Sequence, residues 1–314
     1  MIALFRSKLF MSAIFLLLAI IVTEICLSTF LGLGNPPLYV HGNSYGHIYA
    51  PNQDLIRFNA RTLTNSYSMR SEELSKEDDV RIIKIGDSIV NGGALIDHEE
   101  LSSTLMEKKL QQIYSSRIRV LNISAGGWSP QNQYAYLQKH GIFNSKIILV
   151  EWNGEDLFSK EIFENKIEQI SPNMPNEKPT FAISELLFRY VFQEIQGKAY
   201  DGKASFTKNT SKLSRNDNGI LNIIDLSREK KIVLIVYIHP NKKELDAKRM
   251  DARGQDLIKL LRSENVITYN GLEIMKPSYY RDEIHINKDG HQALSDFFTP
   301  ILCSKLDELD MMEN

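Results

Sequence analysis

Five short runs rich in β-branched and other apolar residues alternate with helical stretches after residue 80. This alternation constrains the fold more than any other feature of the sequence. The runs cover residues 81–85, 118–123, 147–152, 232–238 and 266–269. Nearly continuous apolar strands separated by helices are typical of a parallel sheet that helices cover on both faces. The sequence therefore predicts an α/β domain with a five-stranded parallel sheet.

The N-terminus carries a second strong signal, an apolar run that follows two positive residues. After Arg6 and Lys8 the chain is uncharged from residue 9 to residue 33, apart from Glu24. A helix needs about 20 apolar residues to cross a bilayer, and positive residues before the run place the N-terminus inside the cell. We expect residues 1–33 to be a transmembrane anchor, with the rest of the chain in the periplasm or at the cell surface. An N-terminal signal peptide is the alternative.

Charge and motif content exclude several classes of partner. The formal net charge is −2, so the chain has no general positive field with which to bind nucleic acid. The 7 histidines are scattered without the paired spacing of a metal site, and no phosphate-binding glycine loop occurs. We therefore expect no metal and no cofactor.

Composition divides the part after the anchor into two regions. Residues 34–79 mix proline, glycine, asparagine and tyrosine with short alternating segments, which predicts an irregular β-rich lead-in packed on the core. Residues 80–314 hold the five strand runs and form the predicted main domain. An insertion at about 158–220 contains a predicted helix at 184–196 and then a polar stretch at 198–218, expected to be a mobile loop.

Serine, aspartate and histidine stand where a nucleophilic site needs them. Ser88 follows the first predicted strand, and Asp282 and His285 follow the fifth. The ligand crevice of an open parallel sheet lies beyond the carboxyl ends of its strands, so we expect these segments to meet there. Histidine takes the proton of a nucleophilic serine, and a carboxylate holds the imidazole ring. Ser88 is the predicted nucleophile, His285 the base and Asp282 the group that orients the ring.

Attack on an ester produces an oxyanion, which needs hydrogen-bond donors. The predicted donors are the backbone N–H of Ser88, the backbone N–H of Gly127 after the second strand and the side-chain amide of Asn153 after the third. Trp128 adjoins Gly127, and two interpretations of it remain open. Its ring either stacks on a sugar beside the site or is buried in the core.

These segments together resemble the four blocks of the SGNH (GDSL-like) hydrolase family. The resemblance rests on Gly86-Asp87-Ser88, Gly127, the Asn153 turn and Asp282-x-x-His285, and it spans about residues 80–300. It implies a three-layer α/β/α flavodoxin-like fold and serine-dependent hydrolysis or transfer of ester-linked acyl groups, without a metal. The lead-in, with Asn35-Pro36-Pro37-Leu38-Tyr39, also resembles membrane-anchored members associated with bacterial surface polysaccharides.

The third block departs from the family pattern, which reads Gly-x-Asn-Asp or Gly-Asn-Asp. Here the chain has Asn153-Gly154-Glu155-Asp156, so a strict alignment places Glu155 where the family has asparagine. Either Asn153 supplies the amide from a shifted position, or the oxyanion hole has only two donors. Losing one donor typically lowers the rate by about 10²-fold or more.

The resemblance implies an extracytoplasmic serine esterase that acts on O-acyl groups of a surface glycan through an acyl-serine intermediate. Acetyl is the expected acyl group, and an acylated carbohydrate is the expected partner. Three alternatives remain open. They are an acyltransferase on the same glycan, a lipid esterase, and a non-catalytic glycan-binding or assembly protein that keeps the esterase scaffold but carries Glu155 in the third block.

Overall fold

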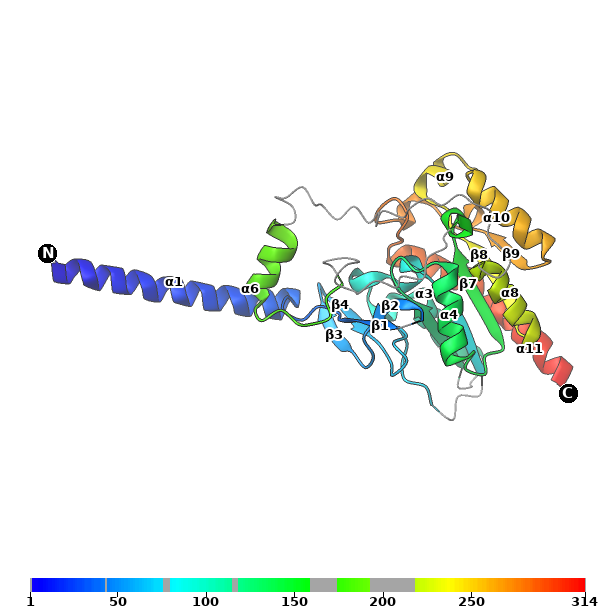
Figure 1. The fold of residues 1–314 in the computed structure, drawn as a ribbon, viewed down its shortest axis with the longest axis horizontal. Coiled ribbons are helices and arrows are strands. Elements are labelled where there is room, and N and C mark those ends of the chain that lie inside the picture. The colour runs from blue at the N-terminus through cyan, green and yellow to red at the C-terminus, as the bar shows by residue number, and fades with distance from the viewer. Residues whose placement is uncertain are drawn as a thin grey trace.

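The computed structural model describes residues 2–42, 44–75, 80–114, 118–158, 174–192 and 218–313. The first element, α1 (Ile2–Leu31), projects from the rest of the molecule as one long helix (Figure 1). Its segment Lys8–Leu31 is long and apolar enough to cross a membrane, and the protein buries none of its most apolar window. The predicted apolar N-terminal helix is therefore present.

The predicted five-stranded parallel sheet is confirmed. Its strands run in the spatial order β6-β5-β7-β8-β9, and every neighbouring pair is parallel. This is the flavodoxin-like strand order, in which ligands bind where the order reverses, beyond the carboxyl ends of the strands. Here the reversal lies at β5, between β6 and β7. The strands are β5 (Val80–Gly86), β6 (Ile118–Ser124), β7 (Ile147–Trp152), β8 (Val233–Ile238) and β9 (Ile267–Asn270).

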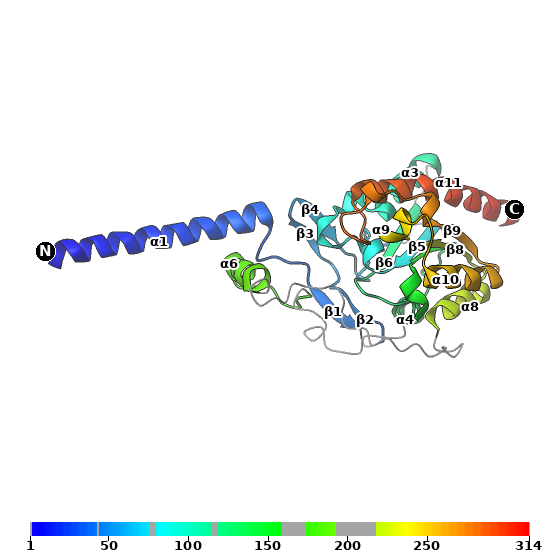
Figure 2. The same cartoon turned by 90° about the horizontal axis from the view of Figure 1, so that it is seen from above.

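Helices cover both faces of the sheet and complete the predicted three layers (Figure 2). Because successive side chains of a strand point to opposite faces, Ile83 packs toward one layer and Ile82 toward the other. On the Ile83 face lie α4 (Pro130–His140), α8 (Gly219–Glu229) and α10 (Ala252–Ser263). On the Ile82 face lie α3 (Ser102–Tyr114) and α11 (Lys288–Glu313).

The lead-in forms two antiparallel hairpins. The first pairs β1 (Tyr39–Gly42) with β2 (Gly46–Tyr49), and the second pairs β3 (Asp54–Arg57) with β4 (Ala60–Leu63). The buried Arg70 guanidinium joins this region to the main domain, because its Nη1 donates to the carbonyl oxygens of Asn91 (2.6 Å) and Gly93 (2.7 Å). The lead-in is thereby tied to the loop that follows the first sheet strand.

Part of the predicted insertion is described. Residues 182–191 are helical, first as α6 (Ala182–Glu185) and then as a wider π-helical segment, η4 (Leu186–Val191). The helix predicted at 184–196 thus begins two residues earlier, and its last residues lie outside the described part of the chain. The predicted loop at 198–218 also lies outside it, except for Asn218, which caps α8.

Short elements complete the chain. Two small helices are α2 (Ser88–Asn91) and α9 (Lys242–Asp246). Short 3-10 turns lie at Gly93–Leu95, His98–Glu100, Gly154–Phe158, Gly271–Glu273 and Pro277–Tyr279.

Candidate active site

Ser88, His285 and Asp282 form one hydrogen-bonded chain at the carboxyl end of the sheet. Ser88 is the first residue of α2, directly after β5. His285 Nε2 lies 2.9 Å from Ser88 Oγ, and His285 Nδ1 lies 2.8 Å from Asp282 Oδ2. The structure therefore brings Ser88 together with two residues from the far end of the chain, since Ser88 and His285 are 197 positions apart in the sequence. The carboxylate oxygen on Nδ1 fixes the proton there, so Nε2 is left to accept the Ser88 proton.

Two backbone N–H groups hold the Asp282 carboxylate. Its Oδ1 accepts from the N–H of His285 (2.7 Å) and from the N–H of Ile284 (3.0 Å). Burial would raise the pKa of Asp282, but these bonds and the His285 ring together lower it below its ordinary value. Asp282 therefore stays ionised and keeps the ring of His285 in a single orientation.

Two further carboxyl groups, those of Asp87 and Asp156, are buried near the nucleophile segment. Asp87 caps α2, where its Oδ1 accepts from the N–H of Ile89 at 2.9 Å. Burial, opposed by this bond, raises the pKa of Asp87 to about 6. Burial and the charge of Asp87 also raise the pKa of Asp156, whose Oδ2 accepts from the Asn153 N–H at 2.8 Å. The turn after β7 is therefore close enough to the nucleophile segment for the two carboxyl groups to influence each other.

The glycine turn after β6 lies against the nucleophile. A methyl group placed on Gly126 would lie 3.9 Å from Ser88 Cβ, whereas one placed on Gly127 would meet nothing within 4 Å. Gly127 has a φ of 74°, a conformation that favours glycine. The Cβ direction of Gly126 therefore points toward Ser88, and that of Gly127 points into open space. The two residues share a peptide plane, so the donor role of the Gly127 N–H remains a prediction.

His47, from the lead-in, fixes the orientation of that peptide, and sequence reasoning missed it. Its Nε2 lies 2.7 Å from the carbonyl oxygen of Gly126. Burial, the largest influence, lowers the pKa of His47, so the ring is neutral near pH 7 and donates this bond. Because a trans peptide points its C=O and N–H in opposite directions, holding the Gly126 carbonyl also aims the Gly127 N–H. The sequence gives no local signal for this contact between residues 79 positions apart.

Asn153 and Glu155, the two alternatives for the third block, lie in different surroundings. Asn153 is only 9% exposed, and its Oδ1 accepts from the Glu155 N–H at 2.9 Å. Its amide nitrogen has no partner within the described residues. The Glu155 side chain is 69% exposed and pairs with Arg253 of α10. Glu155 is therefore engaged by α10, whereas the buried Asn153 keeps its amide nitrogen available, and the donor role of Asn153 remains a prediction.

Trp128 belongs to the core. It is 1% exposed, and its Nε1 donates to the His47 carbonyl oxygen at 2.6 Å. The ring lies edge-on to Tyr45. Stacking on a sugar, one of the two interpretations of this residue, is therefore ruled out.

A buried network of polar side chains supports the loop that carries His285 and Asp282. Sequence reasoning missed this network because the strands that carry it are mostly apolar. Lys84 of β5 donates from Nζ to Glu151 Oε2 of β7 at 2.9 Å, and both side chains are 2% exposed. Glu151 Oε1 lies 3.2 Å from Nδ1 of His239. Burial opposes ionisation, but Lys84 and His239 lower the pKa of Glu151 to about 2. His239 Nε2 in turn lies 3.0 Å from the carbonyl oxygen of Ile284, next to His285.

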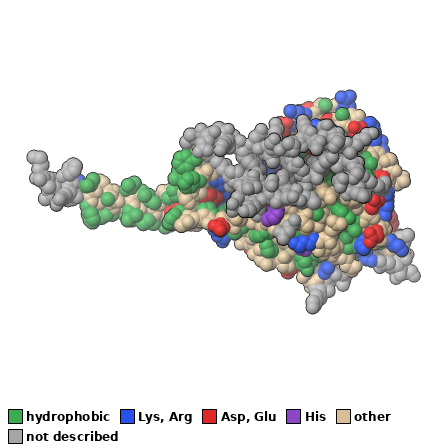
Figure 3. All heavy atoms as spheres, in the orientation of Figure 1, with side chains coloured by type: hydrophobic (Ala, Val, Ile, Leu, Met, Phe, Trp, Pro, Cys, Tyr) green, Lys and Arg blue, Asp and Glu red, His purple; other side chains and the backbone are tan. Residues whose placement is uncertain are grey.

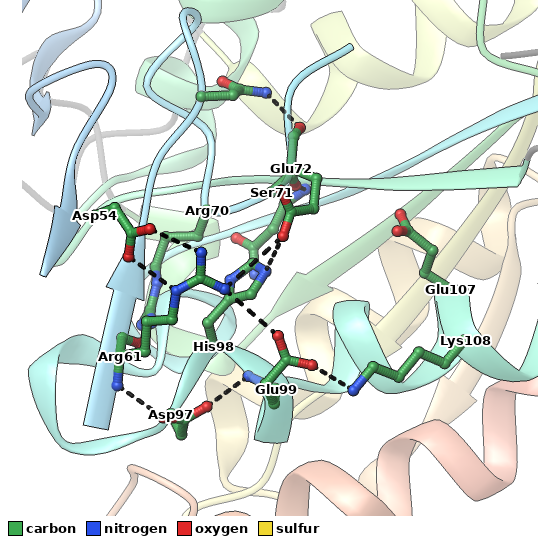
Figure 4. A network of polar contacts seen from close by, with 12 residues as sticks. Asp54, Arg61, Arg70, Ser71, Glu72, Asp97, His98, Glu99, Glu107 and Lys108 are labelled. Atoms are coloured by element: carbon green, nitrogen blue, oxygen red, sulfur yellow. Dashed lines mark hydrogen bonds and ion pairs between the residues drawn. The ribbon is translucent and has the colours of Figure 1, made fainter. Parts of the chain in front are cut away.

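One polar cluster away from this site has the residue types of a metal site. Within the described ranges, Glu72, His98 and Glu99 are the group whose possible ligand atoms all lie within 4.8 Å of one another. Figure 4 shows the Arg61 guanidinium among them, 3.9 Å from Glu72 and 3.7 Å from Glu99, while it also binds Asp54. Arg61 already supplies the positive charge, so we interpret the cluster as an ion-pair network that joins β4 to the turn at His98–Glu100.

Comparisons with known proteins give structural likenesses at low identity. No family model and no curated protein sequence matches the chain. Among solved structures it is similar to a lipolytic protein of the G-D-S-L family from Desulfitobacterium hafniense (10% identity, TM-score 0.43, covering 71% of this chain and 99% of that one). It is also similar to a carbohydrate acetylesterase family member from Sinorhizobium meliloti (12%, 0.40, 73% and 99%) and to an acetyl xylan esterase from Geobacillus stearothermophilus (16%, 0.38, 69% and 92%).

Proposed function

We propose that this protein is a serine esterase of the SGNH (GDSL-like) family, anchored in a membrane, that removes O-acyl groups from a surface glycan. The observation that carries the proposal is the hydrogen-bonded chain from Asp282 through His285 to Ser88. Taken singly, each of these residues has an ordinary structural explanation. Their alignment at the carboxyl edge of a parallel sheet, with donors and acceptors in the order that nucleophilic catalysis needs, has none.

The proposed reaction has two steps. Ser88 Oγ attacks the carbonyl carbon of the ester while its proton moves to Nε2 of His285. The oxyanion receives hydrogen bonds from the backbone N–H of Ser88 and Gly127 and from the Asn153 amide, and it collapses as the leaving alcohol takes the proton from His285. Water then attacks the acyl-serine and gives a proton to His285, and Ser88 Oγ takes this proton as it leaves, which releases the acid and restores the free enzyme. Asp282 stabilises the imidazolium in both steps.

Two residues of the proposed triad are partly exposed to solvent, as access by an acyl group on a large substrate requires. The side chains of His285 and Asp282 are 31% and 49% exposed. A surface glycan carrying O-acetyl groups is the proposed substrate, as the resemblance to membrane-anchored members of the family implies. Transfer of the acyl group to a second hydroxyl of the glycan uses the same residues, and a lipid ester is the second candidate substrate because α1 keeps the site near a bilayer.

The contacts at the end of α1 favour a retained anchor over a cleaved signal peptide. The carbonyl oxygen of Leu31 accepts from the N–H of Phe58 (3.1 Å), and that of Gly32 accepts from Arg57 Nη1 (3.0 Å). Further along the helix, Glu24 accepts hydrogen bonds from the backbone of α6. Cleavage after the apolar run would remove these partners from the folded domain. We propose that α1 stays in place and that the domain after it lies outside the cytoplasm.

Steady-state hydrolysis of an aryl acetate by the full-length protein tests the enzymatic claim. The wild type should hydrolyse the ester, and Ser88→Ala should show no hydrolysis above background. Asp282→Asn should lower the turnover by about 10⁴-fold, because the His285 ring is then no longer held in the useful tautomer. Asp289→Asn, at an exposed position in the first turn of α11, is the matched control and should keep wild-type rates. A wild type without turnover would favour a non-catalytic glycan-binding or assembly protein instead.

A further inference from the structure

The helical segment 182–191 and its flanks expose an unusual density of large apolar side chains. Outside α1, the other large apolar residues that the described part of the chain exposes are separated in sequence: Ile56, Tyr67, Leu95, Ile113 and Ile267. Within 181–192 they instead crowd together: Phe181 (59% exposed), Leu187 (39%), Phe188 (68%), Tyr190 (41%), Val191 (38%) and Phe192 (43%). Isolated apolar residues at a surface are ordinary, whereas a contiguous patch marks an interaction site. We call these six residues the apolar face of α6–η4.

The charged residues of the same segment point back into the protein. Glu185 is 3% exposed and accepts a 2.5 Å bond from Arg57 Nη2 and a 3.1 Å bond from Arg189 Nη1. Its Oε2 accepts from the N–H of Gly34, at 2.6 Å, where the chain leaves α1. Arg57 Nη2 also donates to the Tyr190 hydroxyl at 3.0 Å. This buried ion pair fixes the rotation of the helix, so that Tyr190 lies at the inner edge of the apolar face and the other five side chains point outward.

The first turn of the segment is tied directly to α1. Glu24, the acidic residue of the apolar run, accepts hydrogen bonds from the N–H of Ala182 (2.6 Å) and from the N–H of Ile183 (2.9 Å). These are two of the N–H groups that a helix start leaves without intrahelical partners. An unpaired carboxylate is costly in an apolar environment, and these two bonds supply its partners. They also fix the position along α1 at which α6 begins.

The views show how α6 is oriented relative to α1. It lies beside the C-terminal part of α1 and runs crosswise to it in Figure 1, and it is seen nearly end-on in Figure 2. A helix crosswise to a transmembrane helix runs along the membrane plane. Figure 3 shows the apolar side chains of α1 and those around α6 as neighbouring surfaces.

The depth of Glu24 agrees with such a placement. From Leu9 to Glu24 α1 rises about 22 Å, at 1.5 Å per residue. The hydrocarbon core is about 30 Å thick, so a span that begins at Leu9 puts Glu24 about 8 Å inside the outer boundary. Interfacial helices bury their apolar face about 5–10 Å into the boundary between headgroups and acyl chains. The apolar face of α6–η4 therefore lies at the depth where such helices are found.

We propose that α6–η4 is an interfacial membrane helix, whose apolar face enters the outer leaflet beside α1 and fixes the orientation of the main domain over the bilayer. The inference rests on the proposal that α1 spans a membrane. It adds a second contact with lipid, which neither the anchor nor the ester chemistry requires. A second copy of the chain or another protein would be the competing occupant of this face.

Lipid-specific quenching of a tryptophan at the most exposed position tests the proposal. Phe188→Trp in the full-length protein, reconstituted in phosphatidylcholine vesicles, should lose about half of its added emission to lipids brominated near the headgroup and less to lipids brominated at the chain ends. Aqueous acrylamide should quench it weakly. Ile113→Trp on α3, at a similarly exposed apolar position of the main domain (59% against 68% for Phe188), should show the reverse. The buried Trp128 and Trp152 provide the common background.

Two outcomes would overturn the proposal. Efficient acrylamide quenching of Phe188→Trp without bromolipid quenching would mean that the face lies in water, and protection from both quenchers would mean that protein covers it. Alkaline carbonate extraction and aryl acetate hydrolysis of the same vesicles report separately on the anchor and on the enzyme. If both succeed while bromolipid quenching fails, only the interfacial helix is wrong. If carbonate extracts the chain, the membrane anchor is wrong and the interfacial helix falls with it.

Discussion

Asn153 and Glu155 are two residues apart but occupy different environments. The Asn153 side chain is held by its oxygen in the turn after β7, with the amide nitrogen left for a ligand, whereas Glu155 points to Arg253 on α10. We therefore propose that, relative to the family pattern that the third block resembles, the amide is displaced by two positions along the chain, from position 155 to Asn153. The carboxylate of Glu155 is exposed and pairs with Arg253 of α10.

Kinetics of two variants at this turn separate the two alternatives. Asn153→Ala should lower kcat on an aryl acetate by about 10²-fold or more with little change in KM, because the lost bond strengthens only in the transition state. Glu155→Gln, the paired control, should keep kcat near the wild-type value. A rise in activity for Glu155→Gln together with an unchanged Asn153→Ala would mean that Glu155 occupies the donor position.

Two buried histidines make stability depend on pH. Burial lowers the pKa of His291 to about 3 and that of His98 to about 4. In the unfolded chain both rings take up protons near pH 6.5, so the unfolded state binds more protons below that pH. Their contribution to stability is complete above pH 6.5 and is lost as the pH falls toward 4 for His98 and toward 3 for His291.

The His291→Gln variant measures this contribution. Each buried histidine should lower the free energy of unfolding by about 1.4 kcal/mol for each pH unit below about 6, so the variant should lose stability less steeply than the wild type. Urea unfolding of the detergent-solubilised protein at pH 7 and pH 5 compares the two slopes. Equal slopes for variant and wild type would show that His291 titrates normally in the folded protein.

At the scale of elements, the centre of the sheet is held by an ion pair as well as by apolar packing. Lys84 and Glu151 connect the adjacent strands β5 and β7, and Glu151 continues through His239 to the loop that carries His285. Replacing only one residue of such a buried pair is strongly destabilising, because the remaining charge then has no partner. Replacement of the pair as a unit by apolar residues is often neutral.

A double-mutant cycle tests this interpretation of the sheet. Lys84→Met should destabilise the protein by about 3–5 kcal/mol, and Lys84→Met combined with Glu151→Leu should recover much of that loss. Denaturant unfolding of the two single variants and the double variant gives the coupling energy. Additive effects of the two substitutions would show that the pair does not act as a unit.

The sequence predicted the strands, and the meeting of Ser88, Asp282 and His285, for physical reasons that are local. Apolar runs such as 147–152 have to be buried, and Ser88 and His285 follow strands whose carboxyl ends meet at one edge. The pairing of polar side chains inside the sheet could not be predicted from the sequence. Periodicity shows that a position is buried, but not that Lys84 meets Glu151 there.

Contacts between distant segments were also beyond sequence reasoning. His47 reaches Gly126 from a hairpin in the lead-in, and Glu24 caps a helix 158 residues later. Neither pair leaves a local pattern, because the contact depends on how separate elements pack. From the sequence, Glu24 was only the one charged residue of the apolar run.

At the scale of the whole molecule, the candidate site and the end of α1 are connected by a short stretch of chain. Met174 lies beside Gly126 at the site, and Ala182 lies at Glu24. The eight residue steps between them span at most about 29 Å when fully extended. The candidate site therefore lies within that reach of the contact between α6 and α1.

The side of the membrane on which the main domain lies can be tested with fused reporters. A reporter that is active only outside the cytoplasm, fused after Asn314, should be active, because the positive residues precede the apolar run. A matched fusion of a reporter that is active only in the cytoplasm should be silent. The opposite pair of results would place the main domain inside the cell and contradict the proposed location.

The central claim is that the folded protein activates Ser88 as a nucleophile, and covalent labelling by a fluorophosphonate tests it most directly. The probe reacts with serines whose proton a neighbouring base removes, and it needs no knowledge of the natural ester. Full-length wild-type protein should carry one label, mapped by mass spectrometry to the peptide that contains Ser88, and heat-denatured protein and Ser88→Ala should carry none. An unlabelled folded wild type, or a label that persists in Ser88→Ala, would contradict the account.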